Sequence, residues 1–406
     1  MNLITLKPMR KSFLGVSLAA LVASLPVSAE EWQIGLSGEF NQYLGYVSYD
    51  GATSSDFDGF DAVGTAQVSI VPMVTLNSGL RFGSYIELEG HYGERNAGVA
   101  FDEASLFVRG GFGEVLVGKS DTPGNHMQFG APSGYGPDVN FSGLSSVSLP
   151  SLLQFSNVHN NVRVGDDLLR GTLGSTQVSN TGEETQGRIT YFSPRLAGFQ
   201  LGVSYAPEEP NQAPNRQDFF DIGANYTNNF NGLDVGVSAK WGTADNFATP
   251  AANPEYWGVG LNLGYGRVSV GGSYAESSGS AAGITDGRAF DLGATYRAGR
   301  FGYSLNYFNG ENTDNENAGL GTRERLETVT LAVGYDLKRR SETLAGLSRP
   351  GSDHGGELGL PQGMGAMVFG FVSYADFSED VGDGGIATPG DNIDGFVVGT
   401  GLRLNF

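Results

Sequence analysis

Residues that could carry out catalysis or hold a metal ion are few and scattered in this chain of 406 residues. Its four histidines, His91, His126, His159 and His354, show no metal-ligand spacing, and the lack of cysteine excludes thiolate sites and disulfides. There is no Gly-x-Ser-x-Gly nucleophile motif, and no glycine-rich loop opens a helix that could cradle a phosphate. The sequence therefore predicts no enzyme, no metal site and no cofactor.

The remaining candidates are charged side chains, and the elements that carry them have a clear pattern. Apolar residues alternate with polar ones along much of the chain, as in Trp32, Ile34 and Leu36 or within 233–241 and 301–307. Alternation with period two places one set of side chains on each face of a sheet. The face opposite the apolar residues carries these charges: Glu39, Arg81, Glu87, Glu89, Glu103, Arg109, Arg188, Lys240, Arg297 and Arg403.

After residue 29 no apolar run is long enough for a membrane-spanning helix. An all-β, transmembrane antiparallel barrel accounts for the alternation, because only every second residue then faces lipid. The pattern predicts sixteen strands near residues 31–48, 61–76, 80–92, 99–109, 114–120, 187–194, 199–206, 217–230, 233–241, 256–265, 267–276, 287–297, 301–309, 325–337, 365–377 and 393–406.

The connections between these strands alternate in length. Tight turns such as 77–79 and 231–232 are followed by longer, polar and acidic connections, and the longest is 121–186. Short periplasmic turns and long extracellular loops are typical of outer-membrane barrels. The stretch 338–364 is long where a tight turn is expected, so either it is a periplasmic insertion or a strand pair is misjudged there.

The N-terminal residues 1–29 have the features of a cleaved signal peptide. Lys7, Arg10 and Lys11 precede an apolar stretch, and Val27-Ser28-Ala29 offers a cleavage site, so the barrel is expected to occupy 30–406. Without the three basic residues the chain has 21 Lys and Arg against 44 Asp and Glu, a formal charge of −23. So acidic a chain is unsuited to binding nucleic acid. We expect it in the outer membrane of a Gram-negative bacterium.

Three motifs carry a resemblance to a known family. The segment 187–199 has the pattern R-x-x-Y-x-S-P-x-x-x-G-F, the strand-like segment 113–119 is followed by Thr122-Pro123, and the last strand ends on Phe406, with Phe396, Val398, Leu402 and Leu404 on the same parity. In this order they resemble the Gram-negative general (trimeric) porins, especially the alphaproteobacterial type, in which the second motif precedes the constriction loop. The chain departs from the family pattern in its short loop near 93–98 and in the long stretch 338–364.

The resemblance implies that 121–186 is a constriction loop folded into the lumen. It also implies a homotrimer that passes small hydrophilic solutes, and a Phe406 read as a signal by the outer-membrane assembly machinery. Lipid and lipopolysaccharide would surround the barrel.

A pore selects solutes by combining a size limit with a transverse electric field. We therefore expect loop acids to face wall cations at the constriction, with a mild preference for cations because the chain is acidic. The candidate constriction residues are Arg81, Arg109, Arg188, Glu87, Glu103, Asp121, Asp138, Asp166 and Asp167. Each could instead be a solvated charge or part of a structural ion pair.

The sequence leaves two alternatives open. A substrate-specific channel, for instance for sugars, would need a row of aromatic residues in the lumen, and only Tyr43 and Tyr85 have inward parity. A non-conducting surface or adhesin barrel would need 121–186 to face outward. Loop carboxylates could also hold calcium, although no Asp spacing matches a defined calcium loop.

Overall fold

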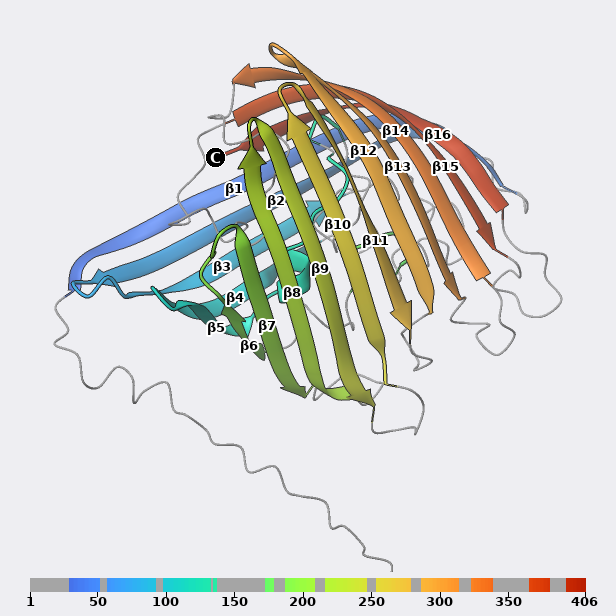
Figure 1. Ribbon diagram of the computed structural model, residues 1–406. Coiled ribbons are helices and arrows are strands. Elements are labelled where there is room, and N and C mark those ends of the chain that lie inside the picture. Colours follow the sequence, from blue (N-terminus) through green and yellow to red (C-terminus); the bar gives the residue numbers. More distant parts are fainter. Residues whose placement is uncertain are drawn as a thin grey trace, which may run out of the picture.

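The computed structural model describes residues 29–51, 57–92, 98–132, 134–136, 172–178, 187–208, 216–246, 253–278, 286–313, 323–338, 365–379 and 392–406. Sixteen strands close into one antiparallel barrel, in which each strand pairs with its neighbours in sequence and β1 pairs with β16 (Figure 1). The predicted fold class and strand count are confirmed. The strands are β1 (Ala29–Gly51), β2 (Phe57–Leu76), β3 (Arg81–Tyr92), β4 (Gly98–Gly110), β5 (Gly113–Lys119), β6 (Gly187–Phe192), β7 (Phe199–Glu208), β8 (Arg216–Phe230), β9 (Leu233–Asn246), β10 (Glu255–Tyr265), β11 (Val268–Ser278), β12 (Gly287–Ala298), β13 (Phe301–Thr313), β14 (Arg323–Lys338), β15 (Gly365–Glu379) and β16 (Asn392–Asn405).

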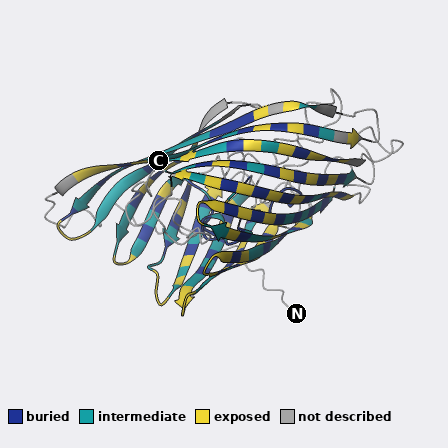
Figure 2. Cartoon of the chain, turned by 90° about the horizontal axis from the view of Figure 1, so that it is seen from above, coloured by how far each residue is buried: buried dark blue, intermediate teal, exposed yellow. Residues whose placement is uncertain are grey.

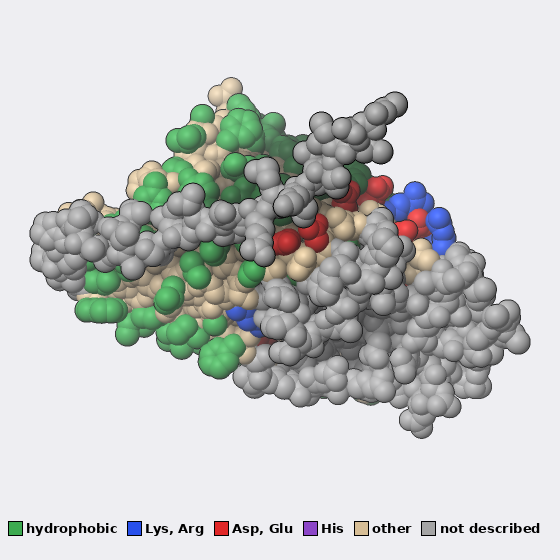
Figure 3. Space-filling view, turned by 90° about the horizontal axis from the view of Figure 1, so that it is seen from below, with side chains coloured by type: hydrophobic (Ala, Val, Ile, Leu, Met, Phe, Trp, Pro, Cys, Tyr) green, Lys and Arg blue, Asp and Glu red, His purple; other side chains and the backbone are tan. Residues whose placement is uncertain are grey.

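The two faces of each strand differ in the way that the alternation predicts. On β10 the apolar Val259 and Leu261 are 46% and 43% exposed on the outside, whereas Tyr256 and Asn262 on the inner face are 1% and 3% exposed. Figure 2 shows this alternation as stripes along the strands. Hydrophobic side chains spread over the outer surface of the strands, as the space-filling view shows (Figure 3). The apolar outer face suits contact with lipid. The closed β-pairing meets a second requirement of the membrane, because it satisfies the backbone polar groups within the barrel.

Aromatic side chains form two belts on the outer face. Near the tight turns, the rings of Phe301 and Tyr335 lie 4.9 Å apart between centroids. Toward the other ends of the strands, Trp257 and Tyr274 lie 5.4 Å apart. Amphipathic rings favour the two interfaces of a membrane, so the belts mark its boundaries. Among the described residues, no helix is long and apolar enough to cross a membrane.

The tight turns have the backbone geometry that their sequences predict. Asn231 and Gly232 join β8 to β9 with φ angles of 51° and 91°. Positive φ at both central residues is typical of the type I′ hairpin turn, which Asn-Gly favours.

The closing strand pairs over its whole length. β16 pairs with β1 from Glu39↔Asn405 to Gly51↔Ile393. Beyond it, the N–H of Phe406 donates to the carbonyl of Gly38 at 3.0 Å, and the N–H of Gly38 donates back at 2.9 Å. β14 pairs directly with β15, so the long connection after Lys338 joins neighbouring strands. Residues 339–364 themselves, and with them the question of a periplasmic insertion, lie outside the described residues.

Candidate functional site

The chain enters the inside of the barrel after β5. We call the described parts of this connection the inner segment: residues 120–132, 134–136 and 172–178. It begins with a short helix, α2 (Pro123–His126), in which the Thr122 hydroxyl caps the Asn125 N–H at 3.3 Å and Pro123 starts the first turn. α2 packs against β7, β8 and β9, and Figure 1 shows it within the ring of strands.

From α2 the inner segment crosses the wall strand by strand. The Phe129 N–H donates to the Ser238 hydroxyl on β9 at 2.8 Å. The Ala131 N–H donates to Asp291 Oδ1 on β12 at 2.6 Å. Farther on, Arg403 Nη2 on β16 donates to the carbonyl of Gly136 at 3.1 Å. The outgoing limb thus lies along the inner face from β9 to β16.

The returning limb, residues 172–178, lies against the same wall. The hydroxyl of Thr176 donates to Asp291 Oδ2 at 3.0 Å. Lys240 Nζ donates to Asn125 Oδ1 and to the carbonyl of Val178, both at 3.0 Å. Asp291 and Lys240 therefore each bind the outgoing and the returning limb.

A polar cluster lies where the inner segment leaves β5. Glu103 on β4 accepts the Asp121 N–H at 3.1 Å, and its carboxylate lies 3.5 Å from His126 Nε2. Burial, and to a smaller extent the charge of Arg188, lower the pKa of His126 to about 4, so the ring is neutral at pH 7. The cluster fixes the start of α2 against the wall.

The predicted wall charges have partners on the wall. Arg109 donates to the carboxylate of Glu114 and to the Tyr85 hydroxyl across the β4–β5 and β3–β4 pairings. Glu87 accepts from Gln67 at 2.5 Å and from Ser69 at 2.8 Å.

A second wall arginine forms a buried ion pair. Arg188 Nη1 lies 3.5 Å from Asp221 Oδ2, and their side chains are 2% and 3% exposed. Asp221 also accepts from the Tyr256 hydroxyl at 2.7 Å.

Two further wall arginines, Arg81 and Arg109, are register partners on the adjacent strands β3 and β4.

The nine predicted constriction residues fall into three groups. Arg81, Glu87, Arg109 and Asp121 are partly exposed on the inner side. Glu103 and Arg188 are buried, at 5% and 3% exposure. Asp138, Asp166 and Asp167 lie outside the described residues.

Among the predicted residues, the structure brings together Glu103 and Asp121, and it places Arg81 opposite Arg109 on β3 and β4. Sequence reasoning missed the contact residues Asp221 and Asp291. Their inward parity, between outward-facing Phe220 and Ile222 and between Phe290 and Leu292, is the signal that could have found them.

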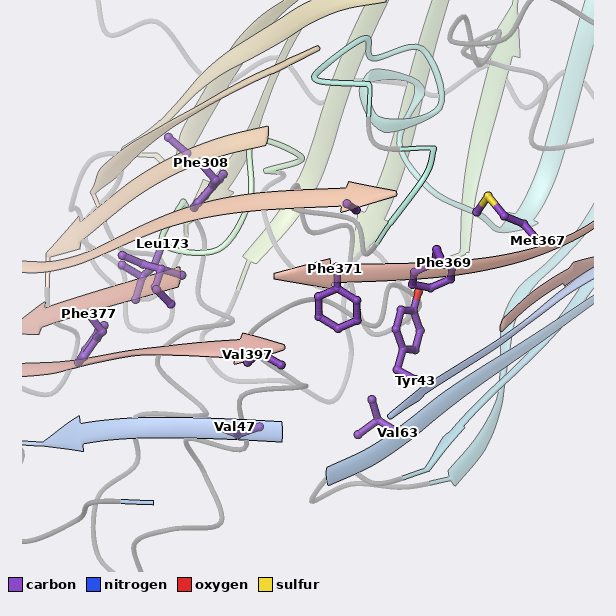
Figure 4. Packing of buried hydrophobic residues seen from close by; sticks show 14 residues of the cluster. Tyr43, Val47, Val63, Leu173, Phe308, Met367, Phe369, Phe371, Phe377 and Val397 are labelled. Carbon is purple, nitrogen blue, oxygen red and sulfur yellow. The ribbon is translucent and has the colours of Figure 1, made fainter. Parts of the chain in front are cut away.

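The inner face also carries an aromatic cluster. Tyr43 on β1 contacts Phe369 and Phe371 on β15, with centroids 5.4 and 6.5 Å apart (Figure 4). The guanidinium of Arg403 lies 5.8 Å from the Phe369 ring centre. These rings are 2–5% exposed, so they pack into the wall. Among the described residues there is no cluster of His, Asp or Glu that could hold a metal ion.

A closed barrel with an apolar outer face, aromatic belts and a polar interior defines an outer-membrane channel protein. Residues 16–354 match the family described as Gram-negative porin. The chain belongs to this family, and it forms an outer-membrane porin channel.

Solved structures of low identity share the fold. The anion-selective porin from Comamonas acidovorans is 16% identical, with a TM-score of 0.55 over 93% of this chain and 100% of that chain. The trimer form of OmpT from Vibrio cholerae is 15% identical, with a TM-score of 0.53 over 93% and 100% of the two chains. No curated protein matches the sequence.

Proposed function

We propose that the protein is a water-filled channel for passive diffusion of small hydrophilic solutes and ions, narrowed by the loop 121–186. The observation that carries this proposal is the position of the inner segment. Its two described limbs are hydrogen-bonded to Asp291 on the inner face of the barrel, where they reduce the open cross-section. This position also disfavours an adhesin barrel, which would need the loop outside.

The exposure of the candidate charged residues decides which of them we assign to the lining of the passage. Arg81, Glu87, Arg109 and Asp121 are partly exposed and belong to the passage. Glu103 and Arg188 are buried and support the loop instead. Further candidates are Asp138, Asp166 and Asp167, which the same loop carries.

We infer a mild preference for cations, because an acidic chain raises the local concentration of cations. A formal charge of −20, or −23 after removal of residues 1–29, supports this inference. The Comamonas porin is anion-selective, so this fold also hosts the opposite preference. Selectivity is therefore set by the charges that each chain carries and not by the fold, and the reversal potential measures it.

The mature protein is proposed to begin near Glu30 after cleavage of the signal peptide and to assemble as a homotrimer. The trimer form of the Vibrio protein, with the same fold, supports trimer assembly. Lipid and lipopolysaccharide would contact the apolar outer face and its aromatic belts. The assembly machinery would read Phe406.

The test is a planar bilayer that separates unequal salt solutions. Stepwise conductance with closures in threes, and a reversal potential of the sign expected for cations, would support the proposal. No conductance from folded protein would overturn it.

Neutralising a lining cation, Arg81→Gln, should move the reversal potential toward stronger cation preference. The control Arg267→Gln changes the same charge at an exposed turn and should leave the reversal potential unchanged.

A substrate-specific channel is the second candidate, and the aromatic cluster is the observation that bears on it. Phe369 and Phe371 add to the two tyrosines with inward parity. Solutes stack only on exposed rings, and all four rings are buried, Tyr43 against Phe369 and Phe371 and Tyr85 against Phe107. The cluster therefore favours a non-specific channel, and a sugar should not block its current at millimolar concentration.

A further inference from the structure

The wall beneath the outgoing limb is lined with glycine. On three pairs of adjacent strands the glycines are also register partners: Gly202↔Gly223 on β7–β8, Gly271↔Gly293 on β11–β12 and Gly302↔Gly334 on β13–β14. On the strands between these pairs, Gly236 of β9 and Gly260 of β10 lie under Phe129. The inner segment therefore meets a glycine on each of eight consecutive strands, although at Gly293 and Gly334 a wall side chain, Asn306 or Met367, is nearer still.

The contacts follow the order of the chain. A Cβ at Gly202 would lie 2.7 Å from Pro123, one at Gly293 would lie 2.9 Å from the Cβ of Ala131, and one at Gly302 would overlap the Tyr135 ring. The most restrictive position is Gly260, where a Cβ would lie 1.8 Å from the Phe129 carbonyl oxygen. A side chain at such a position would push the segment off the wall.

Backbone conformation does not explain these glycines. None of the eight has the positive φ that requires glycine. Glycine inside a strand costs about 0.5–1 kcal/mol relative to alanine, and it often marks the close approach of another backbone. Here the inner segment makes the approach, with its backbone at Gly223, Gly260 and Gly271 and with its side chains at the other five glycines.

Two charged wall residues hold the segment on this surface. Asp291 accepts from Ala131 on the outgoing limb and from Thr176 on the returning limb. Lys240 donates to Asn125 and Val178 in the same two-limb arrangement. Asp291 is 0% exposed, and its two oxygens also accept from the N–H and the hydroxyl of Ser273.

We propose that these wall glycines form a seat that sets the depth of the constriction loop, and that Asp291 and Lys240 are positioning residues that fix both limbs in it. The width of the pore is then determined by residues of the barrel wall and not by the loop alone. This inference rests on the proposed function of the loop as a constriction.

A matched pair of substitutions on β10 tests the seat. Gly260→Ala should displace the loop toward the axis and lower the single-channel conductance. Gly264→Ala lies on the same strand and face, but its new Cβ would meet nothing nearer than 3.5 Å, so its conductance should equal that of the parent. Folding is checked by the mobility of unheated protein in a gel. Equal conductance of both folded variants would overturn the proposal.

A cross-link gives a readout that does not depend on conductance. The chain has no cysteine, so Thr176→Cys on the returning limb with Ser273→Cys on β11 introduces a single pair, at positions whose hydroxyl oxygens lie 2.5 Å apart and neither of which is a glycine of the wall. The two sulfurs would take the places of these hydroxyls, at a separation close to the S–S bond length of about 2.05 Å. We expect cross-linking on oxidation, and slower cross-linking after Asp291→Ala or Lys240→Met. The second of these keeps the test informative if the first fails to fold.

The outcomes separate the two proposals. Conductance by the parent without a cross-link in the folded double variant would overturn the seat and leave the pore. A rapid cross-link that Asp291→Ala slows, in a protein that does not conduct, would overturn the pore and leave the loop's position. A cross-link formed equally fast after both Asp291→Ala and Lys240→Met would exclude the positioning role of these side chains.

Discussion

Arg188 and Asp221 form a buried ion pair close to His126, beside the start of the inner segment. Charges taken out of water are stable only when they are paired and hydrogen-bonded. Asp221 meets this requirement through Arg188, Tyr256 and Ser204. Single residues at this point therefore affect the stability of the barrel more than its outer surface charges do.

Loss of one partner of this pair should destabilise the protein strongly. Arg188→Met leaves the Asp221 carboxylate buried without its cation, and we expect a loss of about 3–5 kcal/mol in the free energy of unfolding. Denaturant unfolding followed by tryptophan fluorescence measures it. Arg188→Met with Asp221→Leu should recover part of the loss. A double variant less stable than the single one would contradict this account.

His126 should make stability depend on pH. Its pKa is about 4 in the folded protein, against about 6.5 when unfolded, so the unfolded chain binds the proton first as the pH falls. The contribution of the neutral His126 ring to the free energy of unfolding is complete above pH 6.5, declines below it and is lost near pH 4. The whole loss is about 3 kcal/mol at most. His126→Gln should remove this part of the dependence. Glu103 and Asp121 lie nearby and carry titratable carboxyl groups. The effect of His126 is therefore measured as the difference between the pH dependences of the free energy of unfolding in the variant and in the parent. Parallel curves from pH 7 to 4 would reject the role of His126.

At the scale of elements, the pairing of β16 with β1 ends where Phe406 meets a glycine. Phe406 exchanges two backbone hydrogen bonds with Gly38, and a Cβ at Gly38 would lie 2.5 Å from the carbonyl oxygen of Gln67 on β2 and 2.6 Å from the Phe406 ring. The ring thus covers the glycine at the point where the barrel closes.

Filling this position should interfere with closure. Gly38→Val is expected to displace the Phe406 ring and lower the fraction of protein that migrates as folded barrel in an unheated gel. Gly370→Val is the control on β15, because the nearest atom to its new Cβ lies 3.7 Å away. Equal folded fractions for the two variants would show that Phe406 does not need Gly38.

At the scale of the whole molecule, the proposed channel belongs to a strongly acidic chain. The chain carries 44 Asp and Glu against 24 Lys and Arg. Fields from partly exposed charges extend about 10 Å at 0.1 M salt and about 3 Å at 1 M. Any preference that comes from the summed charge should therefore weaken with salt.

The ion preference should be larger in dilute than in concentrated salt. The reversal potential across a fixed tenfold gradient is expected to fall when the mean concentration is raised from about 0.1 M to about 1 M, because screening shortens the field. A preference that does not change with salt would instead assign selectivity to charges in direct contact with the ion.

The sequence by itself determined the barrel, because alternation, turn residues and strand number are local or periodic properties. It also contained the pairing of Arg109 with Glu114, since both lie on the hairpin that joins β4 to β5. Parity placed Arg188 and Lys240 inside, but parity names a face and not a partner. Contacts such as Ala131 with Asp291 join residues 160 positions apart, and they depend on sheet register and on the path of the loop. Only the tertiary structure decided these contacts, and with them which wall residues hold the loop in the pore.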